Sequence, residues 1–251
     1  MTSSAVPKLN TLPFRVVLSL LMMATLVSCR QKIEQLNIQS HQNLTLIDSI
    51  VVAGELMEFH SCADFMVYYL GESTDTIVLP RQPISSRVGK GQYGKYENAH
   101  NWAKITPNNI SIQVDTLFHM LEPHHFSHLD EESGNWIVDS IKYQNAFPIV
   151  VTNHSDSLLY LGTHNMIRRM VQEVKDDHGR WVMLDKEGLD LCGVLARDLI
   201  LDPKNMLIAK LPRYKGNTKA AFRLKFGFND GYVYSNTFWD YFDMAKLKPS
   251  K

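Results

Sequence analysis

The chain has no excess of charge of either sign. Its 251 residues include 26 Lys and Arg and 26 Asp and Glu, so the formal net charge at pH 7 is zero. A protein without a bulk positive field does not attract the phosphate backbone of nucleic acid from a distance. We therefore expect no nucleic-acid partner.

The motifs of two large enzyme classes are also missing. No Gly-x-Ser-x-Gly stretch is present, which excludes the nucleophile elbow of an α/β-hydrolase. The glycine-rich stretch "RVGKGQYGKY" (residues 87–96) fails the pattern of a phosphate-binding loop, because Lys95 is followed by Tyr96 in place of Ser or Thr. These two enzyme classes are therefore excluded. A non-catalytic role without a cofactor is favoured, and an enzyme of another kind stays open.

Long hydrophobic runs are absent except near the start. Val16–Val27 is apolar apart from two mild polar interruptions, and Lys8 and Arg15 precede it. As a helix this run would reach about 18 Å, well short of the roughly 30 Å hydrocarbon core of a bilayer. A positive end followed by a short apolar run is typical of a secretory signal peptide. We expect residues 1–28 to be that signal peptide.

The end of this run resembles the lipobox of bacterial lipoproteins, since Leu26, Val27 and Ser28 precede Cys29. The resemblance implies that cleavage leaves Cys29 as the first residue and that its thiol carries lipid. Two or three acyl chains hold a protein on a bilayer, whereas one chain binds only marginally. We expect a cell-envelope protein anchored to the lipid bilayer through acylated Cys29, with residues 29–46 as a polar tether. Because Arg30 follows the cysteine in place of Asp, the outer membrane is favoured over the inner one.

Cysteine is otherwise scarce, which excludes a disulfide-dense scaffold. Only Cys62 and Cys192 follow Cys29. An oxidising envelope favours a bond between them, but free cysteine is also among the most buried residue types. The sequence leaves open a Cys62–Cys192 disulfide and two buried thiols.

Short strands bounded by turn residues dominate the remainder. We expect strand-turn-strand units around turns at residues 71–75, 153–156, 176–179 and 202–205. The C-terminal part carries the strongest pattern, in which Phe222, Leu224 and Phe226 alternate with Arg223 and Lys225. This period of two predicts a strand with one buried face, and the Asn-Asp-Gly stretch that follows predicts a tight hairpin turn.

The stretches "QEVKDDHGRW", "LPRYKGNTKAAFRLKF" and "YSNTFWDY" follow one another in the C-terminal part. This part resembles a set of uncharacterised lipoproteins from Bacteroidota-like bacteria, and the resemblance implies a β-sandwich but no activity. We expect a mostly β fold, with an antiparallel immunoglobulin-like β-sandwich over residues 131–251. A β-rich region over residues 47–130 should precede it.

Four histidines cluster at His119, His124, His125 and His128. Imidazole is a zinc ligand, and two histidines four residues apart share one face if Pro123 opens a helix. The stretch lacks the glutamate of a His-Glu-x-x-His protease. A metal-binding protein or envelope enzyme that uses this cluster is the alternative function, and a solvated, pH-sensitive loop is the simpler interpretation.

The tryptophans Trp136, Trp181 and Trp239 are interpreted as core or sheet-face residues, because Trp buries much area and favours strands. A glycan-binding platform would need several of them exposed on one plane. We expect an envelope lipoprotein with a binding or scaffolding role, whose partner is an unknown envelope protein or glycan. A glycan-binding module is the second alternative.

Overall fold

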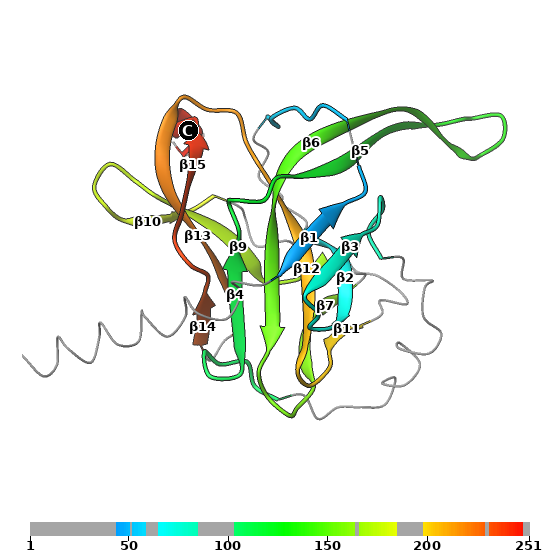
Figure 1. The fold of residues 1–251 in the computed structure, drawn as a ribbon. Helices are drawn as coiled ribbons and strands as arrows, with labels where there is room; N and C mark the ends of the chain where they lie inside the picture. The colour runs from blue at the N-terminus through cyan, green and yellow to red at the C-terminus, as the bar shows by residue number, and fades with distance from the viewer. Residues whose placement is uncertain are drawn as a thin grey trace, which may run out of the picture. The chain divides into compact units, whose positions relative to one another are not determined.

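The computed structural model describes seven segments of the chain: 44–50, 52–58, 65–84, 103–163, 166–184, 198–228 and 231–247. All of them belong to one compact unit, Leu44–Lys251. Their regular structure is almost entirely β-strand (Figure 1). Within these segments the one helical element is a short 3-10 helix, η1 (Met244–Leu247). The prediction of a mostly β fold is confirmed.

Eight strands form the larger sheet, and every pairing within it is antiparallel. Across the sheet the order is β11 (Asp198–Leu201), β7 (Leu159–Thr163), β8 (Met166–Ile167), β2 (Phe65–Glu72), β12 (Asn205–Pro212), β6 (Trp136–Asn153) and β4 (Ile110–Val114). The eighth strand, β5 (Met120–Leu129), also pairs with β6. β6 therefore carries β4 and β5 in succession along one edge and β12 along the other.

A five-stranded antiparallel sheet is built around one long strand, β13 (Thr218–Phe228). β9 (Met170–Lys175) pairs with one edge of β13, and β10 (Trp181–Met183) lies beyond β9. The other edge of β13 pairs first with β15 (Phe238–Phe242) and then with β14 (Gly231–Tyr234). A separate pair, β1 (Thr45–Asp48) and β3 (Thr76–Leu79), is the one parallel strand pairing in the described segments.

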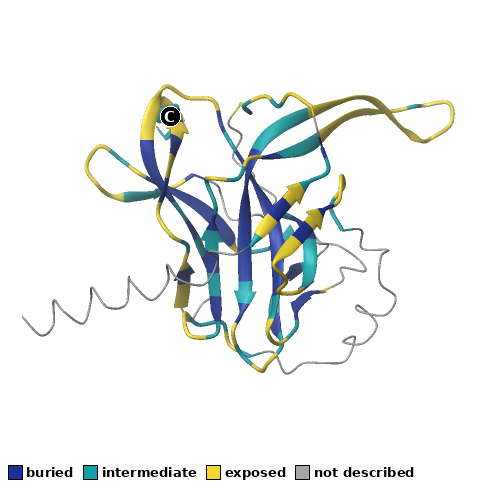
Figure 2. Cartoon of the chain, viewed as in Figure 1, coloured by how far each residue is buried: buried dark blue, intermediate teal, exposed yellow. Residues whose placement is uncertain are grey.

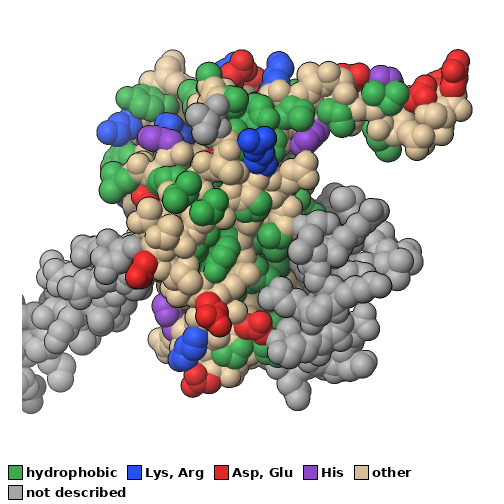
Figure 3. Space-filling view, turned by 45° about the vertical axis from the view of Figure 1, so that its right-hand side comes forward, with side chains coloured by type: hydrophobic (Ala, Val, Ile, Leu, Met, Phe, Trp, Pro, Cys, Tyr) green, Lys and Arg blue, Asp and Glu red, His purple; other side chains and the backbone are tan. Residues whose placement is uncertain are grey.

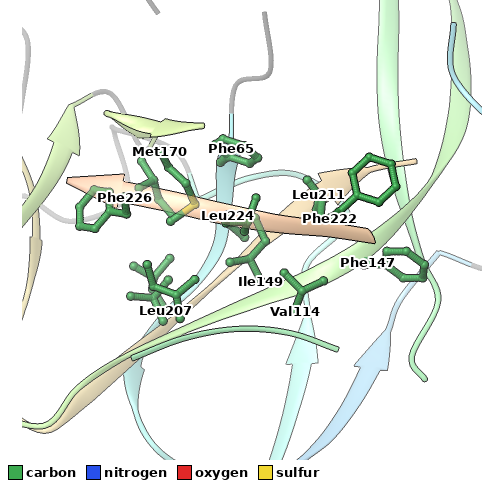
Figure 4. Close-up of a cluster of buried hydrophobic side chains, with 14 of the residues drawn as sticks. Phe65, Val114, Phe147, Ile149, Met170, Leu207, Leu211, Phe222, Leu224 and Phe226 are labelled. Atoms are coloured by element: carbon green, nitrogen blue, oxygen red, sulfur yellow. The ribbon is translucent and has the colours of Figure 1, made fainter. Parts of the chain in front are cut away.

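The two larger sheets pack face to face over one hydrophobic core. Phe222, Leu224 and Phe226 of β13 are buried, which confirms the predicted period of two. They face side chains of the larger sheet, including Ile149 of β6 and Leu207 of β12 (Figure 4). Burial of such side chains is the main favourable term in folding. The arrangement is sandwich-like, and its immunoglobulin-like character stays a prediction.

Two polar contacts also join these sheets. Asn236, in the loop between β14 and β15, accepts a hydrogen bond from the Val114 amide at 2.7 Å and donates one to the Val114 carbonyl at 3.0 Å. Arg213, just after β12, donates two hydrogen bonds to the Asp240 carboxylate at 3.0 and 2.6 Å. Paired, hydrogen-bonded geometry of this kind fixes the mutual position of two elements.

The outer face of the larger sheet is covered by β1 and β3 over a second cluster of buried side chains. Lys210 of β12 is fully buried on this face. Its ammonium nitrogen lies 3.9 Å from the centre of the Tyr68 ring and 4.0 Å from the Asp48 carboxylate, and it donates to the Leu121 carbonyl. Burial lowers the pKa of Lys210, against the opposing effect of the Asp48 and Glu122 carboxylates.

The predicted strands are present, but several do not pair with their neighbours in sequence. β2 and β3 flank the turn at residues 71–75, yet β2 pairs with β12 and β8 whereas β3 pairs with β1. The strands that flank the turn at residues 153–156 also pair elsewhere, so the interpretation of these two units as hairpins is wrong. The predicted strand-turn-strand unit around residues 202–205 is present as β11 and β12. Turn residues indicate that the chain changes direction. Which strands then pair depends on which apolar faces must be buried together. The hairpins β9–β10 and β13–β14 are confirmed.

The predicted division between residues 130 and 131 falls in the turn of the β5–β6 hairpin. β2 lies before this division and β12 after it, and the two pair directly in the larger sheet. The main core also takes side chains from both sides, including Phe65 and Phe147. The structure therefore groups the two predicted regions in one unit.

The burial of Lys210 generates a testable prediction. The folded state binds the lysine proton less tightly than the unfolded chain, because burial lowers the pKa below the ordinary 10.5. The unfolded chain then binds more protons as pH approaches that value, so this residue makes the free energy of unfolding rise with pH. We predict that the free energy of unfolding of the wild type, relative to Lys210→Met, increases as the pH rises toward 10.5 in urea titrations. A difference that stays constant over this range would contradict the assignment.

Candidate functional site

The three cysteines lie outside the described residues. The lipidation of Cys29 and the alternatives for Cys62 and Cys192 therefore stay predictions.

The four histidines do not converge. His124, His125 and His128 lie on β5, which is a strand paired with β6 along its whole length, so the helix that would put two of them on one face is not formed. In a strand, positions four apart are separated by about 13 Å, and adjacent side chains point to opposite faces. His119 lies in the loop before β5. Among the described residues, no group of three or more His, Cys, Asp or Glu could hold a metal ion.

β5 and β6 form an arm that projects from the larger sheet (Figures 1 and 2). We define the arm as residues 122–144. From His124 to Lys142 every side chain is exposed except that of Asp130, which is half-buried. A two-stranded ribbon without a covering layer is only marginally stable in water. The arm is the longest exposed stretch of strand in the described part of the chain.

The turn at the tip of the arm is ordered by its own hydrogen bonds. The backbone carbonyl of Asp130 accepts a hydrogen bond from the Gly134 amide at 2.8 Å. The Asp130 carboxylate accepts hydrogen bonds from the hydroxyl and the amide of Ser133. These bonds to Ser133 lower the pKa of Asp130. Gly134 has a φ of 67°, a left-handed conformation that glycine adopts without strain. The tip is thus a defined turn.

One face of the arm is apolar. Leu129 pairs with Trp136, Ser127 with Val138, and His125 with Ile141, and directly opposed side chains in an antiparallel ladder share a face. The register shifts between Phe126 and Ser127, and this β-bulge brings Val138 and Trp136 to the same face as Ile141. Trp136 is 70% exposed and Val138 52%. We call this set the apolar stripe: Leu129, Trp136, Val138 and Ile141.

The other face of the arm is more polar. The His128 Nδ1 lies 2.8 Å from the Asp139 carboxylate, beside the bulge. The ammonium nitrogen of Lys142 lies 5.3 Å from the centre of the Phe126 ring, and the His124 ring lies 5.0 Å from the same centre. His124 and His128 are thus exposed surface residues of a strand, with contacts to neighbouring side chains.

Both edges of the arm are open. Toward the tip of the arm, the pairing of β12 with β6 ends at Ala146. The last backbone contact along that edge of β6 is a hydrogen bond from the Glu55 amide to the Tyr143 carbonyl. From there to Trp136 no described strand pairs with it on that side. The outer edge of β5 likewise has no partner strand among the described residues. Open edges present rows of backbone donors and acceptors to another strand.

The arm carries a strong excess of negative charge. Its carboxylates outnumber its single lysine, Lys142, and they gather at the tip, where the space-filling view shows acidic side chains at the far end (Figure 3). The acidic residues of the arm are Glu122, Asp130, Glu131, Glu132 and Asp139.

Sequence reasoning missed this element. The stretch "DEESGN" between Leu129 and Trp136 has the composition of a hairpin turn, and apolar residues follow it. The sequence-based division between residues 130 and 131 falls in this stretch instead. Trp136 lies at the tip of the arm, whereas Trp181 and Trp239 lie on the five-stranded sheet.

Comparison of the chain with protein-family models, with curated proteins and with solved structures found no match. The site is therefore interpreted from its own geometry. In the described part of the chain no helix is long and apolar enough to cross a membrane.

The placement of the histidines predicts the result of a metal titration. Because His124 and His128 are too far apart on a strand to ligate one ion, replacing both with alanine should leave zinc binding unchanged. The measurement is isothermal titration of zinc into the wild type and the double variant. Stoichiometric binding that disappears in the variant would show that the histidines do converge on a metal.

Proposed function

We propose that this chain is a lipid-anchored lipoprotein of the cell envelope with a non-catalytic binding role, and that the arm is its contact element. The anchor in this proposal is acylated Cys29 in the outer membrane, which rests on the lipobox resemblance and the short apolar run before it. The tether that follows would hold the compact unit, Leu44–Lys251, away from the bilayer surface.

The observation that carries the binding role is the combination of open edges and an apolar stripe on one projecting hairpin. Natural sheets protect their edges with charge, bulges or covering segments, since an open edge pairs readily with other chains. In the arm the bulge and the acidic tip restrict this pairing, yet Val138 and Ile141 stay exposed beside the free edge of β6. A partner strand that adds to this edge gains main-chain hydrogen bonds and buries the stripe.

The charge of the arm indicates the chemistry of that partner. A strand that pairs beside Asp130, Glu131 and Glu132 is favoured if it carries lysine or arginine, and its alternate side chains must be apolar to cover Trp136 and Val138. An anionic bilayer surface repels the same acidic tip. The proposed partner is therefore an envelope protein with an exposed strand of alternating apolar and basic residues.

A site-specific photo-cross-linker tests this proposal. It would replace Val138 in the full-length chain, made in the cells that encode it, with a matched control at Leu117, which is 93% exposed in the loop before β5. We expect one adduct of defined mass at residue 138 and none at residue 117. Mass spectrometry should identify a protein whose cross-linked segment alternates apolar and basic residues.

Binding of the purified partner is then compared between variants. Val138→Asp should weaken it at least about tenfold, because an unpaired carboxylate in an apolar contact costs more than the corresponding ~1.4 kcal/mol. Leu117→Asp should bind as the wild type does. The proposal fails if residues 117 and 138 give the same adducts, if the adduct is a second copy of this chain, or if it is lipid.

A further inference from the structure

The solvent-facing side of the five-stranded sheet is a second surface, separate from the arm. Its side chains can be assigned from the register, since Lys219 pairs with Tyr241, Ala221 with Trp239, Arg223 with Glu173, and Lys225 with Tyr234. These residues alternate with the buried Phe222, Leu224 and Phe226 and therefore point away from the core. We call this surface the aromatic face: Glu173, Lys175, Trp181, Lys219, Arg223, Lys225, Tyr232, Tyr234, Trp239 and Tyr241.

At one end of the aromatic face, Arg223 is held between two rings. Its guanidinium carbon lies 4.3 Å from the centre of the Trp181 ring and 4.0 Å from that of Tyr234. The guanidinium also donates to the buried Glu173 carboxylate at 2.7 and 2.6 Å. Stacking and a paired carboxylate together fix the guanidinium and both rings in one orientation. This end of the face is thus ordered before any ligand arrives.

At the other end the rings are more open. Trp239 is 59% exposed and Tyr241 50%, and both stand on β15 with their neighbours on β13 being the small Ala221 and the flexible Lys219. The ammonium nitrogen of Lys219 lies 6.0 Å from the centre of the Trp239 ring. Because alanine adds no bulk beside Trp239, a flat molecule can lie against the indole within reach of the lysine.

The aromatic face is cationic although the chain as a whole is neutral. It carries Lys175, Lys219, Arg223 and Lys225 against one carboxylate, Glu173. Glu173 is engaged by Arg223 and lies 3.9 Å from the Lys225 ammonium nitrogen, so Lys175 and Lys219 have no acidic partner on the face. A ligand that suits this surface offers flat apolar faces and a few well-spaced negative charges.

We propose that the aromatic face binds a carboxylated polysaccharide. The C–H faces of sugar rings lie against Trp239, Tyr241 and Tyr232, and their carboxylates pair with the lysines beside those rings. From Lys219 to Gly227 the face extends about 26 Å along β13, at ~3.3 Å per residue, so it accommodates an extended oligomer. This inference does not depend on the arm or on its partner.

The charge density favours a uronic-acid polymer over single-stranded nucleic acid. Both offer flat rings, but nucleic acid carries a phosphate at every nucleotide and is bound by grooves with a continuous run of cations. Here Arg223 and Lys225 already face Glu173, which leaves Lys175 and Lys219 as the cations of the face without a carboxylate partner on it. Sparse charge of this kind matches carboxylates that are spaced by whole sugar units.

The test uses the chain from residue 30 onward, which retains the whole compact unit. Polygalacturonate, alginate and hyaluronate are titrated in the presence of a chelator, with methyl-esterified polygalacturonate as the neutral match of the first and oligo(dT) as the nucleic acid. We expect at least one of the carboxylated polymers to bind, more weakly at high salt, and the methyl ester to bind at least about tenfold more weakly, because a charge-assisted contact is lost.

Variants assign the binding to this surface. Trp239→Ala should weaken it at least about tenfold, as removal of an exposed aromatic anchor does in other interfaces. Trp136→Ala, which removes an even more exposed tryptophan from the arm, should leave it unchanged. Lys219→Gln should reduce both the affinity and its salt dependence. The proposal is overturned if none of the three polymers binds, if the ester binds equally well, if oligo(dT) binds more tightly, or if the two tryptophan variants behave alike.

Discussion

The continuity of β6 is the constraint on which the described structure depends. Its C-terminal half, Ala146–Asn153, is paired on both edges and almost fully buried, whereas its N-terminal part is paired only with β5 and exposed. Phe147, Ile149 and Val151 all belong to the main core, so a slip of one residue would turn them to the opposite face. The core therefore fixes the register of the arm.

Tyr143 and Ile141 continue the same alternation outward along β6, and the bulge then places Val138 and Trp136 on the same face. The apolar stripe is in this sense an extension of the core face beyond the point where the five-stranded sheet covers it.

The two proposed binding surfaces have opposite charge. The arm is acidic, with Asp130, Glu131 and Glu132 at its tip, and the aromatic face is cationic, with Lys219 and Arg223 among its residues. A net charge of zero excludes a bulk field but says nothing of how charge is distributed over the surface. Separate surfaces of opposite sign would allow one chain to hold the proposed basic protein partner and the proposed acidic polymer at once. This combination is consistent with the scaffolding role expected from the sequence.

The strands were predictable from the sequence to the extent that their patterns are local. The alternation of Phe222, Leu224 and Phe226 with charged residues predicts β13 and its buried face, because a period of two has one structural solution. The pairing of the strands was not predictable. β2 and β12 are far apart in sequence, and the residues Phe65–Leu70 do not indicate which strand pairs with them.

His124 and His128 show the converse error. A spacing of four suits a helix, but the pairing of β5 with the apolar residues of β6 decides the conformation. The aromatic face was partly visible in the exposed positions between the buried phenylalanines, whereas the sandwich of Arg223 between Trp181 and Tyr234 arises only from the packing of three strands.

Hydrogen exchange along the free edge of β6 tests most directly the claim that a partner strand pairs with this edge of the arm. The amides of residues 137–142 that point away from β5 have no partner strand among the described residues and should exchange rapidly in the purified chain. In envelope preparations, which contain the proposed partner if the account holds, the same amides should exchange at least about tenfold more slowly, while those bonded to β5 should change little. Edge amides that exchange equally fast in both preparations would contradict the account.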